Sequence, residues 1–232
     1  RAGTSSVALT VSAGQTYSIT DRGGVSLSSG GTRATTVSGY GRVEADAGRT
    51  TPDGLAIFGF RQNGILVSEA GVPASATIQE GRIFAEINGP VRTGLAIANP
   101  NNATVTVFFV FTDVNGLDYG GGSFTIGAME QTAKFLDEAP FNGGASVLGT
   151  FTFTSNLPIS VIALRGLTNE RSEFLMTTLP VAPLTASTVD TLYFPHFADG
   201  AGWTTQIILV NPTNFPIGGR VQFFDTGSDT VA

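Results

Sequence analysis

The feature that most constrains this chain is an internal repeat of about 116 residues that is out of phase with the ends of the sequence. The phrase IANPNNATVTVFFVFTDVNGLDYG at 97–120 is matched by LVNPTNFPIGGRVQFFDTGSDTVA at 209–232, an offset of 112 positions. In each copy an Asn-Pro pair is followed by an apolar run. Self-similarity at a fixed period indicates a tandem array of one structural unit, so the sequence predicts repeated domains.

Four further blocks recur in the same order, with offsets that range from 104 to 116, as insertions in loops would produce. The matches are LTVSAGQT at 9–16 with FTIGAMEQT at 124–132, GRVEA at 41–45 with GTFTF at 149–153, LAIFGFR at 55–61 with ISVIALR at 159–165, and Val72-Pro73 with Leu179-Pro180. One whole unit is therefore expected at 76–185. The back part of a unit is expected at 1–75, and the front part of another at 186–232.

Strand signals run throughout the chain, whereas helix signals are nearly absent. Runs rich in Val, Ile, Phe and Thr, several of them alternating apolar with polar residues, are typical of strands. Asn-Gly at 63–64, 88–89 and 115–116 favours tight hairpins with positive φ at both residues. The segment AMEQTAKFLDEA at 128–139 is the best candidate for a helix, of one or two turns. We predict an all-β fold of tandem antiparallel β-sandwich units, immunoglobulin-like, each with seven to nine strands and about 116 residues.

Composition narrows the classes of partner. The net charge of −6, with Lys134 as the single lysine and no basic cluster, argues against nucleic acid and anionic membrane surfaces. No apolar run approaches the roughly 18 residues of a membrane span. The absence of cysteine excludes disulfides and thiolate metal sites. Much Thr, Ser and Gly with almost no Lys favours a secreted or cell-surface bacterial protein, and a start at Arg1 indicates a processed or excerpted chain.

Three phrases carry a resemblance to a known group of modules: FPHFADGAGWTTQIILVNPT at 194–213, GLAIFGFRQNGILVSEAGVPA at 54–74 and NERSEFLMTTLPVA at 169–182. They resemble modules found, often near the C-terminus, in large secreted bacterial proteins, mostly of unassigned function. The resemblance implies a secreted β-sandwich module and brings no catalytic residues. In those modules the HFADG block opens the unit and the TTLP block closes it, whereas here HFADG follows TTLP. This break in order falls at the seam that the internal repeat reveals.

Two acidic clusters could carry chemistry, and each has a simpler interpretation. Asp225-Thr226-Gly227-Ser228 resembles the catalytic loop of aspartic proteases, but those enzymes pair two such loops and the chain has one. We interpret it as a strand-ending turn and expect no enzymatic activity. Asp113, Asn115 and Asp118 have the close spacing of a calcium loop but lack the bidentate Glu, and a hairpin turn is the alternative. We expect no cofactor.

The remaining titratable candidates are single residues. His196 is the only histidine, which excludes a multi-histidine metal site and favours a structural role. Arg61 and Arg165 recur at the ends of equivalent strands, where an ion-pair role is favoured over a ligand-binding role.

Four aromatic residues, Trp203, Tyr40, Tyr119 and Tyr193, would form a sugar-binding platform if they were exposed together; packing within the fold is the alternative. Asn102 begins a glycosylation sequon, Asn-Ala-Thr, so glycans are a further candidate partner.

A unit that lacks strands leaves an apolar groove and an unpaired edge, which natural proteins cover. We expect SSVALTVSA at 5–13, with Val7, Leu9 and Val11 on one face, to pair beside 219–224 of a neighbouring chain. There it would meet Val221, Phe223 and Phe224. Such head-to-tail joints generate an open fibre, so the sequence predicts a structural subunit of an extracellular fibril. A covalent array of the same modules fits equally well, and a carbohydrate- or surface-binding module of a secreted protein or adhesin is the alternative function.

Overall fold

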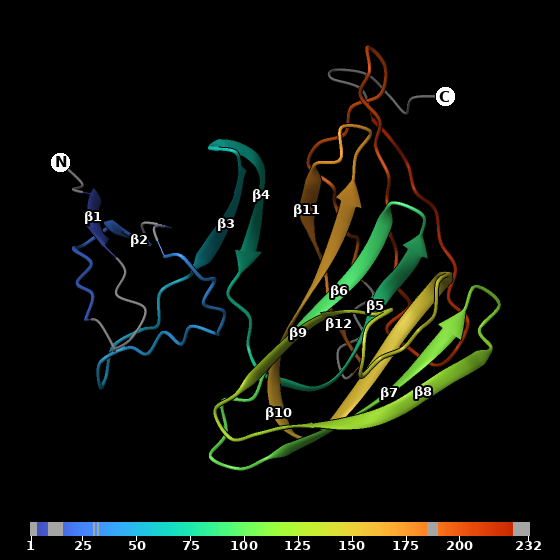
Figure 1. The fold of residues 1–232 in the computed structure, drawn as a ribbon, viewed down its shortest axis with the longest axis horizontal. Coiled ribbons are helices and arrows are strands. Elements are labelled where there is room, and N and C mark those ends of the chain that lie inside the picture. The colour runs from blue at the N-terminus through green and yellow to red at the C-terminus, as the bar shows by residue number, and fades with distance from the viewer. Residues whose placement is uncertain (1–3, 9–15, 30, 32, 185–189, 225–232) are drawn as a thin grey trace. The chain divides into compact units, whose positions relative to one another are not determined.

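The computed structural model describes residues 4–8, 16–29, 31, 33–184 and 190–224. The chain forms two compact units, Arg1–Gly39 and Tyr40–Ala232. Across the described residues every regular element is a β-strand, which confirms the predicted all-β class (Figure 1). Within that same part of the chain, no helix has the length and apolar character to cross a membrane.

The first unit contains one two-stranded sheet. β1 (Thr4–Ala8) and β2 (Gly24–Ser28) pair in parallel, with Thr4 opposite Gly24 and Ala8 opposite Ser28. The sequence predicts antiparallel neighbours throughout, and this pairing corrects that prediction. Fifteen residues, 9–23, connect the two strands. Parallel pairing requires a connection of a dozen or more residues, because the chain has to return to the same end of the sheet.

The second unit contains the remaining strands. In chain order they are β3 (Leu55–Gln62), β4 (Ile65–Pro73), β5 (Ile78–Asn88), β6 (Val91–Ala98), β7 (Val105–Asp113), β8 (Asp118–Ile126), β9 (Gln131–Phe135), β10 (Val147–Thr168), β11 (Phe174–Leu179) and β12 (Ala182–Pro183). β3 and β4 form a separate hairpin, and the other eight strands form one antiparallel sheet.

The long strand β10, with 22 residues, organises this sheet. Its first half, up to Thr154, lies between β5 and β7. Its second half, from Ser160, lies between β6 and β11. The register breaks between Thr154 and Ile159, around Pro158. Because one bent strand serves both sets of neighbours, the sheet curls into a half-barrel (Figure 1). This architecture does not confirm the predicted tandem immunoglobulin-like units.

The core of the half-barrel follows from strand alternation. In β7 the residues at every second position from Val105 to Phe111 are buried, whereas Phe108 between them is exposed. Aromatic rings fill the centre, and Phe109 stacks on Phe151 with ring centroids 5.3 Å apart. The whole core cluster is drawn from residues between Ile83 and Leu179.

The candidate helix at 128–139 is not a helix. Residues Gln131–Phe135 form β9, which pairs antiparallel with β6, and turns follow. Leu136, directly after β9, is fully buried in the core. Pairing with β6 and burial of one large side chain outweigh the weak helix propensity of such a short segment.

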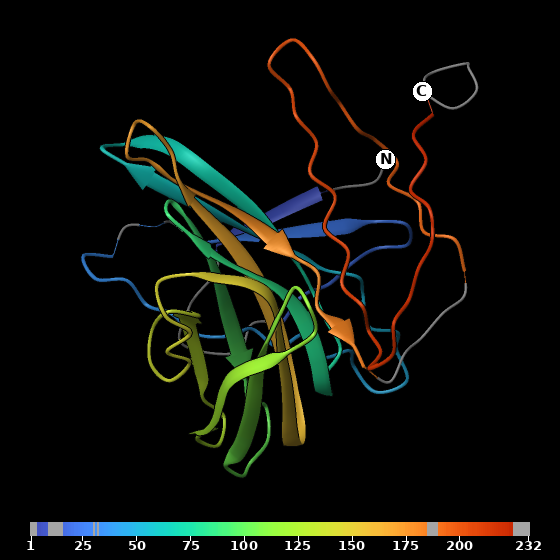
Figure 2. The ribbon, with the colours of Figure 1, turned by 90° about the vertical axis from the view of Figure 1, so that its right-hand side faces the viewer.

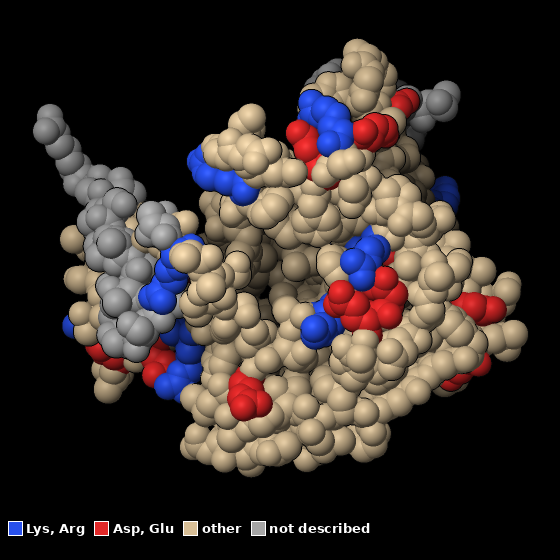
Figure 3. Space-filling model, in the orientation of Figure 1, with Lys and Arg blue, Asp and Glu red and all other residues tan. Residues whose placement is uncertain are grey.

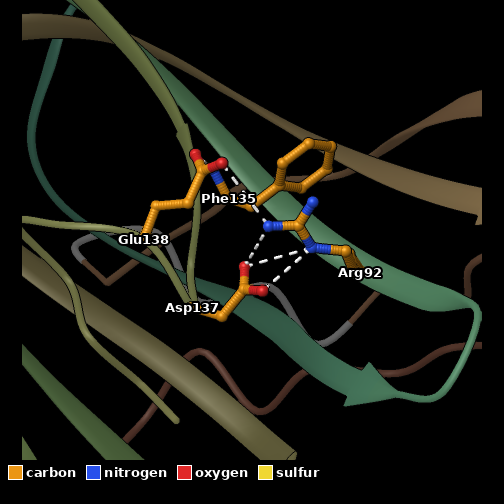
Figure 4. A network of polar contacts seen from close by, with 4 residues as sticks. All are labelled: Arg92, Phe135, Asp137 and Glu138. Atoms are coloured by element: carbon orange, nitrogen blue, oxygen red, sulfur yellow. Dashed lines mark hydrogen bonds and ion pairs between the residues drawn. The ribbon is translucent and has the colours of Figure 1, made fainter. Parts of the chain in front are cut away.

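The turn after β9 is fastened to β6 by Arg92 (Figure 4). The guanidinium donates to Asp137 at 2.8–3.2 Å and its carbon lies 4.0 Å from the centre of the Phe135 ring. Hydrogen bonding to Asp137 is the main cause that raises the pKa of Arg92 above its ordinary value. This contact joins β6 to the turn that follows β9.

Positive φ at both residues of an Asn-Gly pair, as predicted, occurs at one of the three hairpins. Asn63 and Gly64, between β3 and β4, have φ of 52° and 79°. At 88–89 and 115–116 only the glycines have positive φ, of 55° and 83°. All three pairs nevertheless lie between adjacent antiparallel strands.

Candidate assembly surface

The second copy of the repeat does not form the sheet that the first copy forms. Residues 204–223 repeat the sequence of β6 and β7, yet no strand is assigned to them. Figure 2 shows this segment, coloured orange to red, as extended runs without arrows. The runs TLYFPHF at 191–197, TTQIILV at 204–210 and GRVQFFD at 219–225 are rich in strand-forming residues, yet none of their described residues lies in a named strand. A strand requires a neighbouring strand to satisfy its backbone groups.

Short-range structure, by contrast, is the same in both copies. The backbone N–H of Glu86 donates to Thr93 Oγ1 at 2.9 Å. At the offset of 112, the N–H of Ala198 donates to Thr205 Oγ1 at 3.0 Å. The turn between β5 and β6, where Asn88 and Val91 face each other, also has a counterpart.

That counterpart is the turn from Gly200 to Trp203. The backbone N–H of each residue donates to the carbonyl of the other, at 3.1 and 2.9 Å. The two residues lie at the positions of Asn88 and Val91 plus 112. The hairpin turn of the second copy is therefore formed, although its strands are not.

The Asn-Pro turn is the third local structure that recurs. Asn99 Nδ2 donates to the carbonyl of Ala103, and Asn211 Nδ2 donates to that of Phe215, both at 2.8 Å. The side-chain oxygen of each Asn accepts the backbone N–H two residues later. Interactions within a few residues thus give the second copy the turns of the first.

The two Asn-Pro turns differ in their long-range contacts. Asn99 is fully buried, and its amide also donates to the carbonyls of Ile126 and Gly127 at 3.1 and 2.8 Å. Its backbone N–H donates to Glu130 at 2.9 Å. Within the part of the chain that the structure describes, Asn211 Nδ2 donates to the Phe215 carbonyl alone. Among the described residues, no strand lies beside the second turn in the way that the end of β8 lies beside the first.

Four core-facing side chains of the second copy are exposed, whereas Ile207, the counterpart of Leu95, is half-buried. Leu209 and Ile217 have 61% and 63% of their surface exposed, whereas their counterparts Ile97 and Val105 have 1% and 0%. Val221 and Phe223 are exposed by 50% and 37%, against 8% and 1% for Phe109 and Phe111. The pattern that builds a core in the first copy therefore leaves four large apolar side chains facing solvent in the second, although Ile208 packs against the core of the half-barrel.

The β3–β4 hairpin presents a similar surface. Its first strand repeats the second half of β10 at an offset of 104. Ile159 and Val161 of β10 are buried, whereas Leu55 and Ile57 at the equivalent positions are exposed by 62% and 65%. β4 lies against β11, where Ser68 Oγ accepts the backbone N–H of Met176 at 2.8 Å. We call residues 55–61 and 203–223 together the open surfaces.

Arg82 of β5 holds the second copy against the half-barrel. Its Nη1 donates to the carbonyls of Asn211 and Thr213 at 2.8 and 2.7 Å, and its Nη2 to Asn214 Oδ1 at 2.8 Å. Its Nε donates to Thr152 Oγ1 at 2.8 Å. Burial lowers the pKa of Arg82, and the charge of Asp118 opposes this shift. No sequence pattern indicated this contact, because it joins residues 129 to 132 positions apart.

The structure describes some, but not all, of the residues that are predicted to form the joint between chains. Val7 lies in β1 opposite Leu27 of the same chain, and Leu9 and Val11 lie outside the described residues. Val221, Phe223 and Phe224 are exposed. Phe223 makes an edge contact with Phe197, at 4.9 Å between ring centroids. The pairing of 7–11 with 219–224 stays a prediction.

The acidic candidates behave as turn residues where they are described. Asp113 Oδ1 accepts the backbone N–H groups of Asn115 and Leu117 at 2.8 and 2.9 Å. The bond from Leu117 is the main cause that lowers the pKa of Asp113. Asp118 Oδ1 accepts from Thr112 Oγ1. No cluster of three His, Cys, Asp or Glu side chains that could hold a metal ion occurs in the described ranges, and Asp225–Ser228 lie outside them.

The remaining candidate residues differ in their surroundings. Arg165 lies 3.6 Å from Glu86 across neighbouring strands, which confirms an ion pair at this position. Arg61 instead donates to the carbonyl of Gly64 within its own hairpin. His196 is exposed, and so is Asn102, in the Asn-Pro turn of the first copy.

The four aromatic residues considered for a sugar-binding platform make no ring contacts with one another. Trp203 and Tyr193 are exposed, the Tyr119 ring lies 5.9 Å from Phe111, and the Tyr40 hydroxyl donates to Met129 Sδ. No ring contact between described residues joins two of the four. Charged side chains are few and of mixed sign on the face in Figure 3.

One pocket of about 330 Å³ opens beside β8. It is lined by Phe109, Phe111, Tyr119, Ser123, Pro140, Phe141, Asn142, Gly143 and the glycines at 120–122. The glycines place no side chain over this edge of the sheet, and the core rings that line the pocket, Phe109, Phe111 and Phe141, remain buried.

Comparisons with known proteins add little. No protein-family model matches the chain, and a search of curated proteins finds no match. Among solved structures, the chain is similar to one described as "Crystal Structure of Thermotoga maritima 1070", with a TM-score of 0.35 and 14% identity. The alignment covers 44% of this chain and 93% of that one.

Proposed function

We propose that this chain is a structural subunit of an extracellular bacterial fibril, and that each open surface is completed by the matching part of another copy, head to tail. The observation that carries the proposal is the contrast between the two copies of the repeat. Turns formed by neighbouring residues are present in both, whereas the core-facing side chains are buried in one and exposed in the other.

The repeat supports a second copy of this chain as the partner. In the half-barrel, β9 and β10 pair with the two edges of β6, and β8 and β10 pair with the two edges of β7. The sequences equivalent to β8 and to the second half of β10 lie at 5–13 and 55–61. Another copy of this sequence therefore carries the strands that residues 203–223 lack. On this reading 76–185 is the closed unit, and 1–75 and 186–232 are parts of units shared between copies.

The energies support a stable joint. Complete burial contributes about 1.5–3 kcal/mol for each Leu, Ile, Val or Phe side chain. Leu55, Ile57, Leu209, Ile217 and their neighbours Val221 and Phe223 are about half exposed, so together they contribute on the order of 5–9 kcal/mol. Association costs about 4–15 kcal/mol. Each ladder hydrogen bond adds about 0.5–1.5 kcal/mol, so the apolar contacts offset much of the cost and the ladder makes the joint favourable.

Electron microscopy of the purified protein tests the proposal. We expect unbranched filaments that, after full denaturation, give a band near the chain mass of 24.0 kDa. A species many times larger after denaturation would identify a covalent array of the same modules instead. Monodisperse single chains at high protein concentration, with no filaments, would overturn the assembly.

A further inference from the structure

The edges of β3 and of residues 203–210 are complementary. β3 pairs with β4 on one side, and no strand lies at its other edge among the described residues. Its counterpart, the second half of β10, has β11 on one side and β6 on the other. Residues 203–210 are the counterpart of β6 and are not part of a sheet. β3 therefore lacks a neighbour equivalent to β6, and residues 203–210 lack a neighbour equivalent to β10.

We infer that β3 of one copy pairs antiparallel with residues 205–210 of a second copy, in the register that β10 keeps with β6. This inference rests on the proposed assembly and names a joint in addition to the expected pairing of 7–11 with 219–224. In the half-barrel Val161 lies directly opposite Ile97, and both are buried. The equivalent residues are Ile57 and Leu209, so the register places two exposed aliphatic side chains against each other.

At the next pair on the same face of the sheet, a small side chain lies opposite a large one in both copies. Ala163 lies opposite Leu95, and both are buried. The equivalent pair is Gly59 and Ile207. A small residue on the β3 side again faces a large aliphatic residue, as close packing of cross-strand neighbours requires.

The third pair is identical in both copies. Arg165 lies opposite Thr93, and the equivalent residues are Arg61 and Thr205. Thr205 already accepts the N–H of Ala198, as Thr93 accepts that of Glu86. The side chain of Thr205 therefore makes the same local contact as that of Thr93 before any partner binds.

Other registers break these matches. A shift of one residue turns the apolar set to the opposite face. A shift of two residues in one direction places Arg61 against Ile207, a charge against an apolar side chain. The opposite shift places Leu55 against Leu209 and Ile57 against Ile207, which loses the match of small with large. That last register is the strongest competitor, and it defines the control.

Cysteine cross-linking of the full chain tests the register, and the natural sequence has no cysteine to interfere. One variant carries Ile57→Cys with Leu209→Cys. A second carries Ala56→Cys with Val210→Cys, which is the adjacent pair in the same register. Successive pairs in an antiparallel ladder alternate between hydrogen-bonded and non-hydrogen-bonded pairs, so the two variants sample both kinds. The control carries Leu55→Cys with Leu209→Cys. Directly opposite Cβ atoms lie about 4.5–5.5 Å apart and diagonal ones about 7–8 Å, whereas a disulfide needs about 3.5–4.5 Å.

We expect both test variants to give ladders of covalent multimers under mild oxidation, and the control to stay single. Mixing chains that carry only Ile57→Cys with chains that carry only Leu209→Cys should give dimers and nothing larger. Filaments with cross-links in the control alone, or in none of the three, would overturn the register and leave the assembly intact. Cross-links confined to single chains at high dilution, with no filaments, would overturn both.

Discussion

Arg82 and Asn211, which are 129 positions apart, are joined by a 2.8 Å hydrogen bond from the guanidinium to the backbone carbonyl. The same guanidinium binds the carbonyl of Thr213 and the side chain of Asn214. The closed half-barrel therefore holds the Asn-Pro turn of the second copy in a fixed conformation. A turn that is already ordered lowers the entropy cost when a partner strand binds beside it.

Replacing Arg82 by Ala should release this turn. Hydrogen bonds to a charged group contribute about 1.5–3 kcal/mol, so hydrogen exchange at the amides of Thr213 and Phe215, which are hydrogen-bonded within the turn, should accelerate by roughly 10- to 100-fold. Arg82→Lys should rescue only part of the effect, because one ammonium cannot reproduce the planar fork. Arg42→Ala, which removes an exposed pair with Glu44, is the control and should leave this exchange unchanged.

Asn99 and Asn211 should respond differently to replacement by Ala. Asn99→Ala leaves the carbonyls of Ile126 and Gly127 without a buried donor, which should cost about 2–4 kcal/mol in denaturant unfolding. Asn211→Ala should cost less than about 1 kcal/mol in the dispersed chain, because its turn is partly exposed. In assembled material the two losses should become similar. Equal losses in the dispersed chain would contradict the difference in burial.

Gly121 and Gly120 form a matched pair in β8. A Cβ on Gly121 would lie 2.5 Å from the carbonyl oxygen of Phe109, which is backbone and cannot move aside. Gly121→Ala should therefore destabilise the chain by about 1–3 kcal/mol in thermal or denaturant unfolding. A Cβ on Gly120 meets Phe111 at an ordinary 3.8 Å, so Gly120→Ala should be neutral or slightly stabilising. Similar losses in both variants would contradict the close approach.

The turn at Asp113 should weaken in acid. The backbone N–H of Leu117 holds the pKa of the Asp113 carboxyl below its ordinary value. A carboxyl with a lowered pKa in the folded state favours the turn above the unfolded pKa, and this contribution disappears as the pH falls through the folded value. Amide shifts of Asn115 and Leu117 in NMR titration should report this low midpoint, and Asp113→Asn should abolish the transition.

Trp203 offers an optical readout of assembly because it is the only tryptophan. Its side chain is exposed in the single chain, whereas Val91 at the equivalent position of the half-barrel is buried. If the second copy is completed as proposed, Trp203 emission should shift to shorter wavelength and acrylamide quenching should fall as the protein concentration rises. Dilution should reverse both changes. Constant emission across the assembly transition would show that this turn stays outside the joint.

The sequence by itself determined what depends on near neighbours. Alternating β-branched and aromatic residues indicated an all-β chain, and the Asn63-Gly64 pair predicted its hairpin correctly. The duplication also has a structural counterpart, since the turns at Asn99 and Asn211 share their hydrogen bonds. Such interactions span only a few residues, so each copy of the motif forms them wherever it occurs.

Only the tertiary structure decided which strands form and how they pair. β10 takes partners from two sets of strands, β1 and β2 pair in parallel, and the segment around Gln131 becomes a strand because β6 lies beside it. The same dependence explains the second copy, in which a strand-forming sequence stays without a sheet. A strand is stable when a partner supplies hydrogen bonds and a second face covers its apolar side chains, and both come from residues distant in the chain.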